Sequence, residues 1–173
     1  NIDDDCRWLV ALVSDTGLRL SEAAGLRLSD INLEAPVPHV VVEGNQYRGL
    51  KTRGSERKVP LVGASLWAAQ QILAHSHEQS SEAAAFPRYT RGGFAQANSA
   101  SAALNKWLRP YVPKGCTMHS FRHAMRDRLR AVDCPSEMID QIGGWAHVSV
   151  GQGYGSGYPL ENLQRYLDAI VLR

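Results

Sequence analysis

The spacing of hydrophobic and polar positions predicts a mostly helical chain. Apolar residues recur at three- and four-residue steps, as on the buried face of a helix. The predicted helices cover residues 3–14, 21–26, 65–74, 100–108, 119–130, 135–142 and 159–170. Pro110 and Pro113 follow one of them, and Gly143 and Gly144 follow another, as helix-ending residues do. Ser21 and Ser99 are the predicted N-caps of two helices.

Three short segments are predicted to be β-strands: residues 39–43, 47–51 and 57–61. The turn-like residues 52–55 separate the last two segments. We therefore expect a small antiparallel sheet that ends in a hairpin, with Lys51 at its tip. Residues 75–98 are expected to form a loop with at most one short helix. The predicted fold class is mainly α with a small antiparallel β-sheet.

Length and composition fit one globular domain over residues 1–173, long enough for a substantial core. The sequence shows neither an apolar run of membrane-spanning length nor a signal-peptide pattern. Cys6, Cys116 and Cys134 are odd in number and widely spaced, which favours a reduced compartment over a disulfide framework. We expect a cytoplasmic protein without a membrane partner.

The distribution of basic residues indicates a phosphate-rich partner. The net charge is only +2, but fifteen of the nineteen basic residues are arginine, the residue preferred for planar phosphate contacts. Any one of these charges could equally be a solvated surface charge, whereas the distribution as a whole favours nucleic acid. The clustered positions are Arg48, Lys51, Arg53, Arg57, Lys58, Arg122, Arg126, Arg128 and Arg130.

Candidate chemistry centres on residues 119–123, His-Ser-Phe-Arg-His. His119 and Arg122 are one helical turn apart, so an imidazole and a guanidinium project from one face. Such a pair can hold a phosphate and move a proton beside it. Tyr154, in a glycine-rich segment downstream, is a possible nucleophile. These residue types are typical of phosphodiester cleavage, and Tyr158 is a rival for the nucleophile.

Five segments, taken in order, resemble the catalytic domain of tyrosine recombinases, the phage integrase family. Residues 16–22 resemble its first arginine box, residues 49–61 its lysine hairpin and residues 119–123 its second arginine box. Residues 143–145, Gly-Gly-Trp, occupy the place of the commoner Leu-Gly-His, and Tyr154 lies at the nucleophile spacing. Each segment alone is a weak signal, but five in order are specific. The resemblance implies the DNA breaking-rejoining catalytic fold, without the family's N-terminal DNA-clamping domain.

The resemblance also implies how a strand would be cut. Tyr154 would attack the scissile phosphate and leave a 3′-phosphotyrosine and a free 5′-hydroxyl. Arg19 and Arg122 would stabilise the charge of the transition state. Lys51 would protonate the leaving oxygen, with Lys58 as a rival, and His119 would manage the proton of the nucleophile.

The remaining site residues have supporting roles. Trp145 can donate only its indole N–H, so it would bond a phosphate oxygen or buttress the site. Glu22 would orient a guanidinium. His123 is expected to be structural, a buried imidazole bonded to the backbone. The predicted DNA-binding residues are Arg48, Arg53, Arg57, Lys58 and Arg126.

The partners implied are double-stranded DNA and the other protomers of a recombinase tetramer, with the isolated domain monomeric. No metal or other cofactor is implied, because the arginines carry the electrostatic role. The source would be a bacterium or phage, with the protein associated with the nucleoid.

Two alternatives of other classes remain. His119, His123 and Cys116, with His147 and Cys134 downstream, resemble a zinc helix in outline, although no Glu follows His119 and no CxxC pair exists. A catalytically inactive DNA-binding module of the same fold is the second alternative. Within the enzyme class, the glycine-rich run around Tyr154 favours an integrase of phages or genomic islands over a chromosome-dimer or transposon resolvase.

Overall fold

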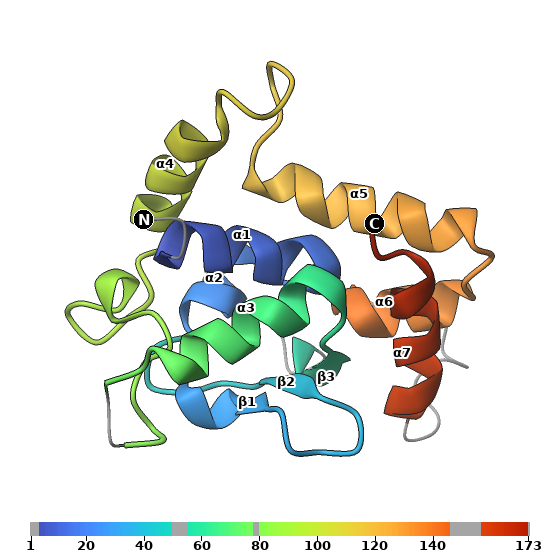
Figure 1. Cartoon of the computed structure of the whole chain (residues 1–173), viewed down its shortest axis with the longest axis horizontal. Helices are drawn as coiled ribbons and strands as arrows, with labels where there is room; N and C mark the ends of the chain where they lie inside the picture. The colour runs from blue at the N-terminus through green and yellow to red at the C-terminus, as the bar shows by residue number, and fades with distance from the viewer. Residues whose placement is uncertain (1–3, 50–54, 78–79, 146–156, 173) are drawn as a thin grey trace.

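A computed structural model describes residues 4–49, 55–77, 80–145 and 157–172. Most of the described chain is helical, and the helices surround one core beside a small sheet (Figure 1). The α-helices are α1 (Asp5–Thr16), α2 (Leu20–Ala24), α3 (Gly63–Ala74), α4 (Ala97–Leu108), α5 (Met118–Ala131), α6 (Ser136–Gly143) and α7 (Leu160–Ala169). Short 3₁₀ turns, η1 (Leu28–Asp30) and η3 (Pro87–Tyr89), complete the helical part.

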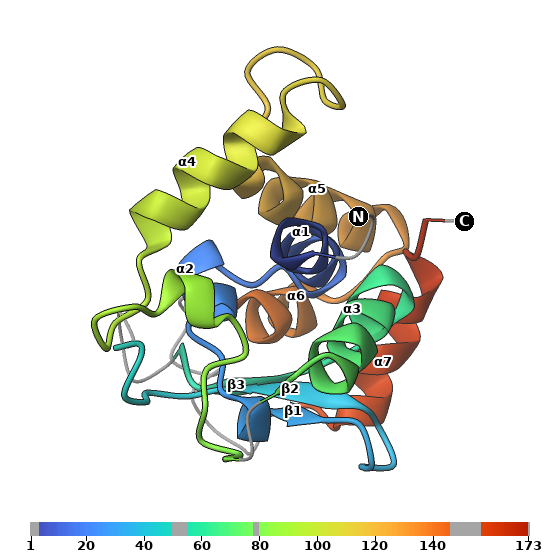
Figure 2. The same cartoon turned by 60° about the vertical axis from the view of Figure 1, so that its left-hand side comes forward.

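The first helix, α1, is the centre of the fold. The Asp4 carboxylate caps its start by accepting from the backbone N–H of Arg7 at 3.1 Å. The helix ends at Gly17, whose φ of 63° is in the left-handed region. A Cβ at Gly17 would lie 2.3 Å from Met125 Cε, so only glycine lets α5 pack this closely. Figure 2 looks almost along α1, which contacts α2, α3, α4 and α5.

The strands β1 (Ile31–Asn32), β2 (His39–Val42) and β3 (Arg57–Pro60) form an antiparallel sheet in that order. Val40 pairs with Val59, and both are fully buried. Helices α6 and α7 contact β3. Strand β3, the second half of the predicted lysine hairpin, therefore packs against the two C-terminal helices.

The predicted strand over residues 47–51 is wrong in its described part, residues 47–49. Asn45 Oδ1 accepts from the backbone N–H groups of Tyr47 and Arg48 at 2.8 and 3.0 Å, which makes a turn in place of a strand ladder. Residues 50 and 51 lie outside the described ranges. The sheet is completed by β1, which was not predicted.

Each predicted helix is confirmed, with its boundaries shifted by a few residues. Neither predicted N-cap is correct: the N-cap of α2 is Arg19, whose backbone N–H donates to the Glu22 carboxylate at 2.9 Å, and that of α4 is Gln96. The helix predicted from Ser99 begins at Ala97. The fold class, mainly α with a small antiparallel sheet, is confirmed. Among the described residues, no helix has the length and apolar character needed to span a membrane.

Candidate active site

Three consecutive carbonyl groups at the C-terminus of α6 each accept a hydrogen bond from a different arginine. Arg57 Nε donates to Ile142 O at 2.8 Å, Arg122 donates to Gly143 O, and Arg19 donates to Gly144 O at 3.2 Å. The last carbonyls of a helix lack intrahelical partners and carry the negative end of its dipole. This helix end therefore brings together guanidinium groups from the first arginine box, the second half of the lysine hairpin and the second arginine box.

Arg122 is buried, with 4% of its surface exposed. Its guanidinium donates both to Gly143 O and to Gly17 O, the residue that ends α1. Burial and the neighbouring charge of Arg19 lower the pKa of Arg122 to about 10, while Glu22 acts in the opposite direction. Arg122 therefore remains charged at neutral pH, in an orientation fixed by two main-chain acceptors.

The counter-ion of this arginine cluster is Glu22 in α2, which is 4% exposed. Arg57 contacts both of its carboxylate oxygens, at 3.2 and 2.8 Å, and Arg19 Nη1 donates to Oε1 at 2.7 Å. Burial raises the pKa of Glu22, but the hydrogen bonds and charges of Arg57 and Arg19 outweigh it, so the pKa is below its usual value. Glu22 is thus ionised and shared between two arginines.

Trp145 lies over the arginines of α5. The ring centroid is 4.2 Å from Cζ of Arg122 and 4.7 Å from Cζ of Arg126, within the range of a cation–π contact. Its backbone N–H donates to Asp140 O at 3.1 Å. A Cβ on Gly143 would lie 1.9 Å from the Trp145 ring, so this glycine makes room for the indole. Trp145 therefore contacts Arg122 and Arg126, and its two expected roles toward a phosphate stay predictions.

The two histidines of α5 form an exposed pair. The rings of His119 and His123 meet edge to face, with centroids 4.6 Å apart. The prediction of a buried His123 bonded to the backbone is wrong, because His123 lies on the solvent side of α5, one turn after His119. Desolvation lowers the pKa of His119, and the charges of His123, Arg122 and Arg19 act in the same direction. His119 is therefore within electrostatic reach of both site arginines.

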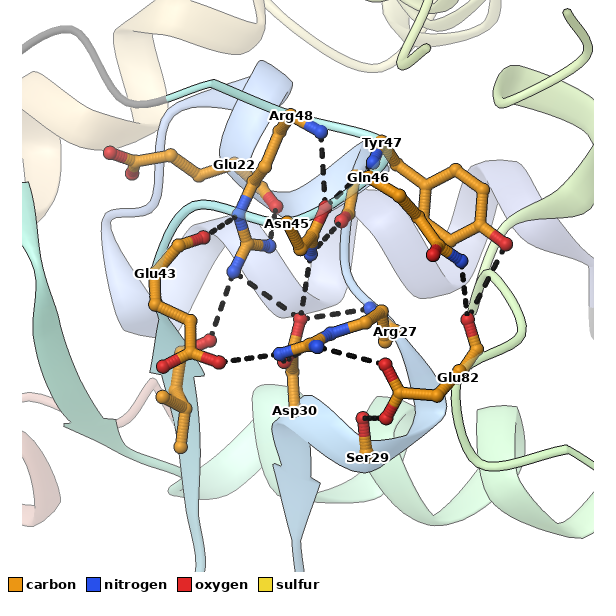
Figure 3. Close-up of polar contacts among 12 residues, drawn as sticks. Glu22, Arg27, Ser29, Asp30, Glu43, Asn45, Gln46, Tyr47, Arg48 and Glu82 are labelled. Atoms are coloured by element: carbon orange, nitrogen blue, oxygen red, sulfur yellow. Dashed lines mark hydrogen bonds and ion pairs between the residues drawn. The ribbon is translucent and has the colours of Figure 1, made fainter. Parts of the chain in front are cut away.

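Arg48 does not face a DNA partner. Its side chain is 2% exposed and donates to Glu43 O at 2.9 Å, Glu22 O at 2.9 Å and Val41 O at 3.1 Å, and it pairs with Asp30 at 3.3 Å. Figure 3 shows this guanidinium among its acceptors, beside the Arg27–Asp30 pair. The predicted DNA contact is therefore wrong for Arg48, whose hydrogen bonds fix the chain around α2 and β2.

Arg57 is also internal. Its side chain is 4% exposed and donates to Ser55 O, Ile142 O and Glu22. The prediction of a DNA contact is wrong here too. The alternation of side chains along a strand indicates this burial. Arg57 is two residues before the buried Val59 and so lies on the same face, whereas the exposed Lys58 lies on the opposite face.

The other predicted DNA-binding positions remain predictions. Lys58 is exposed on β3. The side chain of Arg126 is 36% exposed and has an ion pair with Asp140 at 3.6 Å. Lys51, Arg53 and Tyr154 lie outside the described residues.

The hydroxyl of Tyr158, the rival nucleophile, is hydrogen-bonded to another side chain. Its hydroxyl donates to Glu137 Oε2 at 2.7 Å, and that hydrogen bond, with burial and the charge of Glu137, raises the pKa of Tyr158. Its backbone N–H and carbonyl both bond the side chain of Gln141, at 2.8 and 3.0 Å. This phenol is tied to α6 and is harder to ionise than a free one.

Within the described part of the chain, no three His, Cys, Asp or Glu side chains are grouped as metal ligands would be. His147, a member of the zinc hypothesis, lies outside that part. Of the described residues of the hypothesis, only His119 and His123 are adjacent: Cys134 is buried near the end of α5, whereas Cys116 is exposed before its start.

Comparisons with known proteins identify the family of this chain. The sequence pattern of the phage integrase family matches residues 3–159. Tyrosine recombinase XerD of Corynebacterium glutamicum is 26% identical over 151 residues, which are 86% of this chain and 47% of XerD. The chain thus spans about half the length of this relative.

Solved structures of the Tn1549 transposon integrase share the fold. In complex with a circular intermediate DNA, that integrase superposes with a TM-score of 0.59 at 19% identity, over 95% of this chain and 58% of the integrase chain. In complex with transposon right end DNA, the TM-score is 0.54 at 19% identity, over 93% and 57% of the two chains. With the matched sequence pattern and the joined arginine boxes, the chain belongs to the phage integrase family of tyrosine recombinases.

Proposed function

We propose that this chain is the catalytic part of a site-specific recombinase that cuts and rejoins DNA through a 3′-phosphotyrosine. The observation that carries the proposal is the binding of Arg19 and Arg122 by adjacent carbonyls, Gly144 O and Gly143 O. Two positive charges held at one point suit a phosphate whose negative charge grows during displacement. His119 lies close enough for both charges to lower its pKa.

The proposed reaction balances as two transesterifications. The phenolate of Tyr154 forms a bond to the scissile phosphorus, and the bond from phosphorus to the 5′-oxygen breaks. Lys51 gives that oxygen a proton, and His119 takes the proton of the phenol. Arg19 and Arg122 neutralise the non-bridging oxygens, so the residues of this chain supply the charge that a metal ion supplies elsewhere. Rejoining reverses these steps with a 5′-hydroxyl from another strand.

The test is covalent trapping. The chain is incubated in excess chelator with nicked duplexes that carry sequences from the ends of its own mobile element. We expect a DNA adduct that survives denaturant and is lost in Tyr154→Phe. No adduct on any such duplex, together with retained DNA binding, would support the inactive DNA-binding module instead.

The biological role is a finer proposal. We propose integration and excision of a mobile element, carried out by a tetramer on double-stranded DNA, because the glycine-rich run around Tyr154 resembles phage and island integrases. A recombination assay with two different attachment sites, compared with two identical sites, distinguishes an integrase from a resolvase. Efficient recombination of identical sites alone would favour the resolvase.

A further inference from the structure

The guanidinium of Arg57 connects three parts of the candidate site. It is 4% exposed and donates to both oxygens of Glu22, to Ile142 O at the end of α6, and to Ser55 O in its own segment. A Cβ on Gly144 would lie 2.6 Å from its Nη1, so Arg57 fits closely against this helix end. The proposed reaction assigns no role to Arg57.

Arg57 and Arg19 share a single carboxylate. Arg57 faces it with both terminal nitrogens, Nη1 to Oε1 at 3.2 Å and Nη2 to Oε2 at 2.8 Å, whereas Arg19 reaches Oε1 through Nη1 only, at 2.7 Å. Planar guanidinium and carboxylate groups prefer the two-point arrangement. Because Arg57 has taken it, Arg19 keeps Nη2 for Gly144 O.

The exposure of the two arginines differs accordingly. The Arg19 side chain is 31% exposed and that of Arg57 is 4% exposed. Without Arg57, Glu22 could form a two-point pair with Arg19, which would neutralise the charge of Arg19 and turn it away from Gly144 O. Arg57 therefore controls how much of the charge of Arg19 is offered to a ligand.

We propose that Arg57 is a positioning residue for strand cleavage, which acts by holding Glu22 so that Arg19 can bind the scissile phosphate. The inference rests on the proposed role of Arg19. It assigns to Arg57 an internal function through another side chain, with no contact to DNA.

The main test compares Arg57→Lys with Arg130→Lys. Both keep the charge, but Arg130 is a surface residue whose side chain is 58% exposed and pairs only with Asp127 among the described residues. We expect Arg57→Lys to bind duplex DNA within twofold of wild type and to form the covalent adduct at least tenfold more slowly. Arg130→Lys should match wild type in both measurements.

A methylphosphonate at the scissile position separates positioning from a general structural effect. This substrate lacks the negative charge that Arg19 neutralises. We expect the deficit of Arg57→Lys to shrink at least tenfold on it, as it should for Arg19→Ala. An equal deficit of Arg57→Lys on both substrates would overturn the proposal. If Arg57→Lys fails to fold, Arg57→Gln, which cannot form the two-point pair with Glu22, should show the same recovery on the methylphosphonate, and its absence would count equally against the proposal.

A readout without DNA keeps the two proposals distinguishable. We expect the pKa of the Glu22 carboxyl, followed by NMR, to be higher in Arg57→Lys than in wild type and unchanged in Arg130→Lys. An unchanged Glu22 pKa would refute the coupling even if cleavage occurs. If wild type forms no adduct on any site while Glu22 responds, the proposed function fails and the coupling between Arg57 and Glu22 stands.

Discussion

The guanidinium of Arg122 donates a hydrogen bond to the carbonyl of Gly17, a residue 105 positions earlier in the chain. This contact joins the two arginine boxes directly, because Gly17 ends α1 two residues before Arg19. Gly17 has a positive φ, and a Cβ there would overlap the side chain of Met125, so the turn that presents this carbonyl requires glycine. The position of Arg122 is therefore set by the end of α1 as well as by α5.

Replacing Gly144 should show how closely Arg57 fits against α6. Gly144→Ala places a Cβ 2.6 Å from Arg57 at a φ of +61°. Gly92→Ala is the control, since Gly92 has a φ of +89° but nothing within 4 Å of its Cβ. Both variants should lose about 1–2 kcal/mol from the left-handed backbone. Gly144→Ala should lose a further ~1–3 kcal/mol from overpacking, measured by urea unfolding. Equal losses would contradict this packing.

Acid should destabilise the protein partly through Glu22. Its pKa is lowered in the folded state, so its contribution to stability is present above the ordinary Glu pKa of ~4.3 and is lost as pH falls through the folded value. Glu22→Gln should cost about 3–5 kcal/mol at neutral pH, because it leaves Arg57 buried without a counter-ion.

The free energy of unfolding of Glu22→Gln should then approach that of wild type as the pH is lowered toward 3. Glu161→Gln, at an exposed position on α7, should parallel wild type throughout. A constant difference between Glu22→Gln and wild type across this range would refute the assignment.

His123 should lower the pKa of His119. The positive charge of protonated His123 is one of the causes that lower the pKa of His119, after desolvation. We expect His123→Ala to raise the His119 pKa, measured from the ring carbon-bound proton by NMR, while the exposed His77→Ala leaves it unchanged. If neutral His119 accepts the proton of the nucleophile, adduct formation should fall as pH drops below ~6.5, and the fall should begin at higher pH in His123→Ala.

The nucleophile can be assigned by comparing two tyrosines. Tyr154→Phe should abolish the covalent adduct, whereas Tyr158→Phe should leave most of it, because the Tyr158 hydroxyl is bonded to Glu137. Peptide mapping of the trapped adduct should find DNA on Tyr154. DNA on Tyr158 would overturn this assignment and leave the arginine site unaffected.

The general acid can be assigned with a substrate that has sulfur at the bridging 5′-position. A thiolate leaves without a proton, so this substrate should restore cleavage by Lys51→Ala. It should give no such rescue to Lys58→Ala, since Lys58 is exposed on β3 and is not proposed to act on the leaving group. The opposite pattern of rescue would exchange the roles of the two lysines.

The sequence predicted the helices, two of the strands and the family, because helical periodicity and ordered motifs are local signals. It did not predict which arginines are buried. Arg48 and Arg57 look like surface cations in the sequence, and only tertiary contacts supply the main-chain acceptors of Arg48 and the Glu22 carboxylate of Arg57. The prediction of a buried His123 failed for the same reason. The face of α5 on which His123 lies is decided by the packing of Met125 and Leu129 against the core.

The groups at the end of α6 that accept from the three arginines are main-chain carbonyls, and this limits how the site can change in evolution. Substitutions at residues 142–144 cannot delete a carbonyl, so sequence change there is limited by side-chain size and, at Gly144, by its positive φ. A change in the number of residues of α6 has a larger effect than a substitution. One inserted residue would rotate its last carbonyls by about 100° around the helix axis and move all three arginines at once. Relatives should therefore vary in the composition of this helix far more readily than in its number of residues.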